Sequence, residues 1–101
     1  DAGPRPVRFV EPEYTDEARK RGIRATVLVE VLVDARGRVK ELRLTDRFLL
    51  KGDDRREAVA AIGYGIEEAA LSAANRWMFR PARQGGRAVE SWTTLTFSFG
   101  L

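Results

Sequence analysis

Residues 25–39 read ATVLVEVLVDARGRV and form the most regular stretch of the chain. Every second position in its first part is a valine: Val27, Val29, Val31 and Val33. Because successive side chains of a β-strand point to opposite faces, this alternation predicts a strand over 25–33 with one fully apolar face. Residues 34–37 (DARG) then supply a type I turn, with glycine where a positive φ is favoured. The stretch therefore predicts the first strand and the turn of a β-hairpin.

Two further strands are predicted to flank this one. Residues 39–44 form the return strand of the hairpin, with Leu42 and Leu44 on one face. The last strand is predicted from about Ala88 to Phe99, where apolar residues alternate with threonine and serine. The strand over 25–33 is the most apolar of the three, so we expect it to be central.

Capping residues and helical periodicity predict two main helices. Thr15 is placed to cap the first helix, which ends at Gly22, where a left-handed residue commonly closes a helix. In the second helix, apolar residues recur at helical spacing from Ile66 onward. Pro81 cannot continue a helix, so this one is predicted to end by about Phe79.

A short extra helix is predicted within residues 51–65. Asp54 and Glu57 have the spacing of a capping box, and Gly63 closes the apolar run that follows them. The elements together predict an α+β fold: a three-stranded antiparallel sheet with two main helices on one face, plus this short extra helix.

The chain is predicted to hold one folded domain. Its 101 residues suit a single domain, and 44% hydrophobic residues against 33% charged ones suffice for a core. Residues 1–8 (DAGPRPVR) have the composition of a Pro-rich linker end, which leaves the domain over 9–101. No stretch approaches the roughly 20 apolar residues of a membrane span. The chain opens on Asp1 rather than methionine, so we expect a piece of a longer protein.

The absence of cysteine and histidine excludes much catalytic chemistry. Disulfides, thiol nucleophiles, Cys/His zinc sites and Ser-His or Cys-His catalytic pairs all need those residues. Asp34, Asp53 and Asp54 lie where turns and helix caps favour aspartate, so a structural role is expected for them. The sequence thus predicts no catalytic residues, no metal and no cofactor.

The charged and aromatic residues bear on what the surface of the domain could bind. The net charge is only +3, and most arginines have an acidic neighbour in the sequence, which favours ordinary solvated surface over nucleic-acid binding. Trp77 lies on the apolar stripe of the second helix and is expected to anchor the core. Trp92 shares the polar face of the last strand with Thr94 and Thr96, and an exposed aromatic there indicates a contact surface.

Several motifs together resemble the C-terminal domain of the TonB energy-transducer family. Each motif is weak alone, but their order and spacing over 9–99 are fairly specific. They are Glu11-Pro12-Glu13-Tyr14 with Ala18 and Gly22-Ile23; Val27-Leu28-Val29-Glu30-Val31 with Val33-Asp34-Ala35-Arg36-Gly37-Arg38-Val39; Glu68-Ala69-Ala70; and Trp77-Met78-Phe79-Arg80-Pro81-Ala82, then Gly86, Val89 and the terminal aromatic strand.

The resemblance implies a non-enzymatic periplasmic domain, tethered to the inner membrane by an N-terminal segment outside this chain. Family members bind the N-terminal box peptide of TonB-dependent outer-membrane transporters by β-strand addition, and they transmit energy from the proton-motive force through an ExbB/ExbD motor, as in siderophore uptake. An edge strand suits this role because its unpaired backbone groups accept varied peptides. The resemblance implies these partner-binding residues: Val89, Glu90, Ser91, Trp92, Thr93, Thr94, Leu95, Thr96, Phe97, Ser98, Glu11, Pro12 and Tyr14.

The chain departs from the family pattern in two places, and one alternative function stays open. Thr15 stands where the family commonly has proline, and residues 51–65 exceed the family's usual connection, so no function is carried over to them. The alternative is a homo-oligomerising or scaffold module of TonB or TolA type attached to another protein. In it, an apolar patch of Leu28, Leu32 and Trp92 would join copies, for example as a homodimer.

Overall fold

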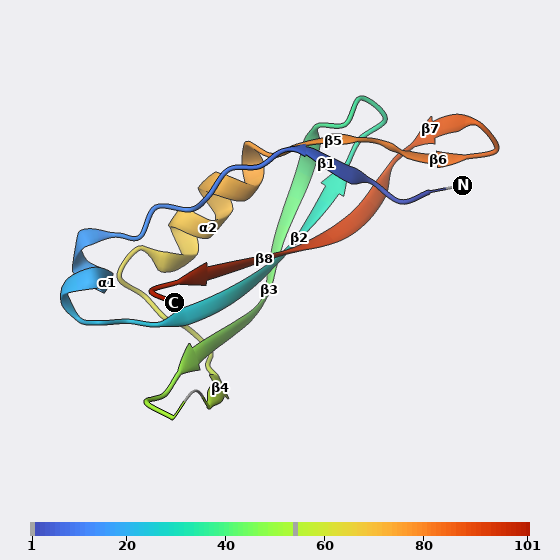
Figure 1. The fold of residues 1–101 in the computed structure, drawn as a ribbon. Coiled ribbons are helices and arrows are strands. Elements are labelled where there is room, and N and C mark those ends of the chain that lie inside the picture. The colour runs from blue at the N-terminus through green and yellow to red at the C-terminus, as the bar shows by residue number, and fades with distance from the viewer. Residues whose placement is uncertain (1, 54) are drawn as a thin grey trace.

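The computed structural model describes residues 2–53 and 55–101 and shows an elongated α+β domain of 48 × 23 × 19 Å (Figure 1). Its elements follow in the order β1 (Arg5–Arg8), α1 (Asp16–Lys20), β2 (Ala25–Val33), β3 (Val39–Leu50), β4 (Arg56–Ala58), α2 (Ile66–Asn75), β5 (Met78–Arg80), β6 (Ala82–Gln84), β7 (Arg87–Val89) and β8 (Ser91–Phe99). Neither helix in this part of the chain is long and apolar enough to cross a membrane.

The main sheet has four antiparallel strands in the order β4-β3-β2-β8. Strand β2 is central, and its four alternating valines are completely buried, as the sequence pattern predicts. Val29 pairs with Leu95 of β8 on one side and with Leu44 of β3 on the other. The valine face is therefore continued by the apolar residues of both neighbouring strands.

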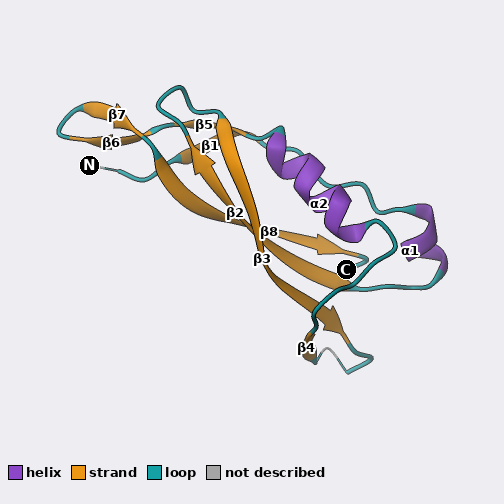
Figure 2. Ribbon diagram, turned by 180° about the vertical axis from the view of Figure 1, so that it is seen from behind, coloured by secondary structure: helices purple, strands orange, loops and turns teal. Residues whose placement is uncertain are grey.

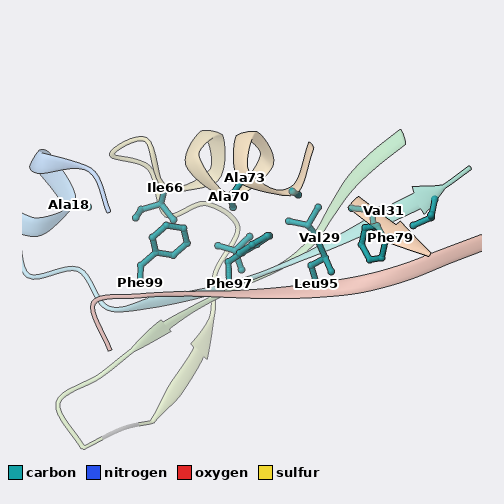
Figure 3. Close-up of a cluster of buried hydrophobic side chains, with 13 residues drawn as sticks. Ala18, Val29, Val31, Ile66, Ala70, Ala73, Phe79, Leu95, Phe97 and Phe99 are labelled. Atoms are coloured by element: carbon teal, nitrogen blue, oxygen red, sulfur yellow. The ribbon is translucent and has the colours of Figure 1, made fainter. Parts of the chain in front are cut away.

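Both helices lie over the same side of the sheet, and α2 packs directly on the valine face (Figure 2). Ile66, Ala70 and Ala73 of α2 are fully buried and belong to one hydrophobic cluster with Val29 and Phe97. Figure 3 shows these side chains meeting between the helix and the sheet. Two main helices on one face are thus confirmed, and small alanines let α2 approach the strands closely.

The turn and the helix cap predicted from local sequence are also present. Asp34 accepts hydrogen bonds from the backbone N–H groups of Arg36 (2.8 Å) and Arg38 (3.0 Å), and Gly37 has a φ of 85°. Thr15 accepts a hydrogen bond from the Ala18 N–H at 3.2 Å, as an N-cap residue should. The turn and the cap each depend on residues within four positions of one another. They therefore form regardless of how the helices and strands pack.

The prediction of a short extra helix within 51–65 was wrong, and so was the count of three strands. Strand β3 continues to Leu50, and β4 (Arg56–Ala58) pairs with it as a fourth strand. Glu57 forms an ion pair with Lys51 at 3.6 Å instead of capping a helix, and Asp54 lies outside the described residues. An isolated helix of this length is marginal in water, whereas the edge of β3 offers ready backbone partners.

Two small ribbons complete the fold at one end of the sheet. Strand β1 pairs with β5, and β6 pairs with β7, so the last strand is shorter than predicted and begins at Ser91. Helix α2 ends at Asn75, and the residues before Pro81 form β5 instead of a last helical turn. All four residues of β1 are exposed. The division into a linker over 1–8 and a domain over 9–101 stays a prediction.

Candidate partner-binding edge

Strand β8 forms one edge of the main sheet. Within residues 2–53 and 55–101 it pairs only with β2, so the backbone groups on its other side have no partner strand. The pairing with β2 runs without a bulge from Ala25 opposite Phe99 to Val33 opposite Ser91. The result is an uninterrupted edge nine residues long, the kind of template to which a further strand adds.

The register identifies the backbone groups that face outward. The Leu50 N–H bonds the Arg24 carbonyl at 2.9 Å and the Asp34 N–H bonds the Arg38 carbonyl at 2.9 Å, so the even-numbered residues of β2 face β3. Successive residues of a strand alternate in direction, so the odd-numbered residues of β2 face β8. Their partners on β8 are also odd-numbered. The N–H and C=O groups that point away from the sheet therefore belong to Trp92, Thr94, Thr96 and Ser98.

A groove of about 410 Å³ lies beside the carboxyl-terminal half of this edge. One wall is the segment Phe9–Pro12, and the other is formed by Thr96–Ser98, with Trp77 between them. Two groups of residues that the sequence analysis assigned to partner binding, Glu11 with Pro12 and Thr96 with Ser98, therefore meet at one place.

Trp77 holds the two walls in position. Its indole N–H donates a hydrogen bond to the Val10 carbonyl at 2.8 Å. Its ring makes edge contacts with Phe9 (5.0 Å between centroids) and Phe97 (5.9 Å). The side chain is half-buried, so this core anchor is also part of the groove. Sequence reasoning missed Phe9, Val10 and Trp77 as groove residues, because only the fold brings together residues 67 positions apart.

Tyr14 follows this segment in the chain and anchors it to the rest of the domain. Its hydroxyl donates a hydrogen bond to the Ile23 carbonyl at 2.6 Å. It also packs against Gly100, where an added Cβ would approach the Tyr14 hydroxyl to 2.9 Å. Tyr14 therefore fixes the course of residues 11–14, but it does not line the groove.

The first two residues of the predicted binding stretch lie outside the free edge. Val89 pairs with Ala82 in the β6–β7 ribbon. Glu90 lies between β7 and β8, and its carboxylate accepts a hydrogen bond from the Lys40 ammonium group at 2.8 Å. The structure thus brings Ser91–Ser98 together on one edge and separates Val89 and Glu90 from it.

The opposite face of the sheet is not covered by either helix (Figure 2). On this face Arg43 reaches across β2 and places its guanidinium 4.6 Å from the centre of the Trp92 ring. It also lies 3.6 Å from a carboxylate oxygen of Glu30. On this face Leu32 is only 9% exposed, whereas Trp92 remains 39% exposed.

Three comparisons with known proteins agree on one family. Residues 10–47 match the family model described as the C-terminal part of the Gram-negative bacterial TonB protein. Protein tonB2 of Pseudomonas aeruginosa is 33% identical over 90 residues, which are 89% of this chain and 28% of the relative. The chain therefore spans less than a third of that relative. The solution NMR structure of the Pseudomonas aeruginosa TonB C-terminal domain superposes with a TM-score of 0.67 at 25% identity, covering 100% of this chain and 89% of that one.

Proposed function

Because this chain belongs to the family of TonB C-terminal domains, we propose that it binds an extended peptide of an outer-membrane transporter by adding that peptide as a strand to β8. The peptide is the N-terminal box of a TonB-dependent transporter, and the domain acts in the periplasm as a non-enzymatic coupling module. The observation that carries this proposal is the unpaired edge of β8, with four residues facing outward.

The groove beside β8 supports the same proposal. A peptide on the edge at Thr96 and Ser98 would lie against the segment Phe9–Pro12, which lines the groove with apolar side chains and Glu11. In strand addition the main-chain hydrogen bonds give affinity, and pockets for alternate side chains give specificity. The open row of backbone groups explains how one domain accepts several transporters, and the groove explains why it selects among extended peptides.

The remainder of the family's mechanism is proposed with it. The energy comes from the proton-motive force through an ExbB/ExbD-type motor that contacts parts of the protein outside this chain. Residues 1–8 are the end of a linker that leads to an inner-membrane anchor. Strand β1 is exposed along its whole length, although its backbone pairs with β5.

The proposal is tested by titrating isotope-labelled protein with a synthetic box peptide and recording backbone amide shifts. We expect the largest shifts at Trp92, Thr94, Thr96 and Ser98, with smaller ones at Glu11. Shifts confined to residues 45–58 of the β3–β4 hairpin, or no shifts at all, would refute strand addition to β8.

Homo-oligomerisation is the second candidate function, and the uncovered sheet face favours it. Strand alternation places Leu28 and Trp92 opposite the buried valine face, and Trp92 is 39% exposed. A second copy covering this face would bury both side chains. Sedimentation at several protein concentrations distinguishes the two candidates, since a constant monomer mass eliminates the second.

A further inference from the structure

One end of the molecule carries a concentration of arginines. Strands β1, β5, β6 and β7 meet at the end of the sheet far from α1 and β4, together with the turn between β2 and β3 (Figure 1). Six exposed arginines of these elements are called here the arginine end. They are Arg5, Arg8, Arg38, Arg80, Arg83 and Arg87.

Among the described residues, no carboxylate forms an ion pair with these arginines. Two carboxylates that lie close to arginines of this set in the sequence are engaged elsewhere: Asp34 accepts hydrogen bonds from the backbone of its own turn, and Glu90 pairs with Lys40.

Several cations at the other end of the domain form ion pairs instead. Arg19 lies 2.8 Å from Asp16, and Arg55 lies 2.8 Å from Asp53. Although the net charge is only +3, positive charge is therefore concentrated at one end of the domain. The arginines are scattered along the sequence, so this charge separation is not visible there. It arises only when β1 folds back onto β5.

The arrangement within the arginine end is unfavourable without an anion. Arg5 and Arg80 are directly opposite each other in the β1–β5 ribbon. Like charges at directly opposite positions of an antiparallel pair repel and destabilise the pairing. A bound carboxylate would lie between two guanidinium groups and replace repulsion by charge-assisted hydrogen bonds.

The arginine end adjoins the proposed peptide site on both sides. The groove wall Phe9–Pro12 continues directly into β1, and β8 begins at Ser91 directly after the β6–β7 ribbon. A peptide paired along β8 that continues past Ser91 would therefore run onto the arginines. Each ribbon strand of three residues spans roughly 10 Å, which is the length of about three peptide residues.

We propose that the arginine end binds acidic residues that flank the added strand in the partner polypeptide. This inference rests on the proposed function, because it concerns the same peptide. It states that the part of the peptide beyond the β8 edge is negatively charged. Up to about three carboxylates, positioned just outside the paired segment on its Ser91 side, would each meet an exposed guanidinium group. The strand then provides recognition of backbone, and the flank provides recognition of charge.

The test uses a synthetic peptide with the core Thr-Val-Ser-Val-Thr-Val and a flank of either Asp-Glu-Asp or Asn-Gln-Asn. The flank is placed at the amino or the carboxyl end in separate peptides, and affinities are measured at about 50 mM and about 500 mM salt. The protein is tested as wild type, as R5Q/R80Q and as the control R19Q/R21Q, which removes the same charge at the opposite end.

For one placement of the flank, we expect the acidic peptide to bind wild type about tenfold more tightly than the amide peptide at low salt. R5Q/R80Q should lose most of this preference and R19Q/R21Q should keep it, while high salt should reduce it in all three proteins. Equal loss in both variants would show non-specific attraction and overturn the inference.

Failure of the inference is distinguishable from failure of the proposed function. If the amide peptide shifts the β8 amides and the acidic flank adds nothing, strand addition stands and the arginine end does not take part. If neither peptide shifts those amides, both proposals fail. Binding of wild type, but not R5Q/R80Q, to anionic lipid vesicles without any preference for the acidic peptide would assign the arginines to a membrane surface and overturn the inference.

Discussion

Trp77 is the residue on which the groove depends. It joins the N-terminal segment to the core through one hydrogen bond to Val10 and ring contacts to Phe9 and Phe97. A half-buried tryptophan with a bonded N–H combines a large apolar contact with a directional one. Its role is therefore to fix the distance between the wall at 9–12 and the edge of β8.

The substitution Trp77→Phe should loosen this wall without unfolding the domain. Phenylalanine keeps an aromatic ring but lacks the N–H, so about 1 kcal/mol of stability should be lost with the hydrogen bond. Hydrogen exchange at Glu11 should accelerate and peptide affinity should fall. For the exchange measurement Trp92→Phe is the matched control, because the Trp92 side chain lies on the opposite face of the sheet; unchanged exchange at Glu11 in Trp77→Phe would contradict this role.

Glu67 has a comparable role at the start of α2. Its carboxylate accepts hydrogen bonds from the N–H groups of Ile62 (2.7 Å) and Gly63 (3.0 Å) and from the Arg47 guanidinium (3.0 Å). Burial acts to raise the pKa of Glu67, but the backbone hydrogen bonds and Arg47 outweigh it, so the pKa is lowered from 4.5. The charged form therefore stabilises the loop before α2.

Glu67 should make stability depend on acid pH. A carboxyl group with a lowered pKa in the folded state stabilises fully above its unfolded pKa, near 4.5, and loses that contribution as the pH falls through the folded value. Glu67→Gln should cost about 1–2 kcal/mol at pH 7 and flatten the decline below pH 4.5. Urea unfolding across this pH range measures the free energy of unfolding, with the exposed Glu68→Gln as control. Parallel stability curves for wild type and Glu67→Gln would disprove this contribution of Glu67.

At the scale of the element, β8 has two chemically different sides. The odd-numbered residues bond β2, while Thr94 and Thr96 direct their backbone groups away from the sheet. Side chains follow a separate alternation, which buries Leu95 and Phe97 and leaves Thr94 and Thr96 exposed. The same two threonines are therefore free in both backbone and side chain, which is what an added strand needs.

Proline substitution in β8 separates binding from folding. Thr94→Pro removes an outward N–H, which edge strands tolerate, so the fold should persist while peptide affinity falls about tenfold with the loss of one or more hydrogen bonds. Thr93→Pro removes an inward N–H and should destabilise the domain by at least about 1 kcal/mol. Circular dichroism and peptide titration of both variants check this; retained affinity in a folded Thr94→Pro variant would rule out strand addition at this residue.

At the scale of the whole molecule, charge is distributed unevenly along an elongated body. The arginine end lies at one tip, while paired ions such as Arg19 with Asp16 lie at the other. The separation depends on the β1–β5 pairing, which sets Arg5 opposite Arg80. The N-terminal segment thereby contributes both a wall of the groove and part of the arginine end.

Relieving the repulsion at this tip should stabilise the free domain. Arg5→Gln removes one of two opposed charges, so the free energy of unfolding should rise by a few tenths of a kcal/mol at low salt, and by less at high salt. Arg19→Gln, which breaks an ion pair, should instead lower it slightly. Thermal unfolding at two salt concentrations compares them; a loss of stability in Arg5→Gln at low salt would contradict the repulsion.

Local patterns determined the central strand, the 34–37 turn and the Thr15 cap, because each depends on residues within a few positions of one another. The alternating valines of β2 required burial on one face whichever strands became its neighbours. The same kind of reasoning failed at residues 51–65, where a capping-box spacing competed with the backbone edge of β3 and the edge prevailed.

Only the tertiary structure decided where the groove and the arginine end form. The groove joins residues 9–12 to residues 96–98, and the arginine end joins residues 5–8 to residues 78–87. No local pattern encodes such pairs, because closing loops of this length is determined by the packing of the whole core. The sequence alone thus specified which strand is apolar and where it turns, and the packed fold selected which edge stays open and which charges gather beside it.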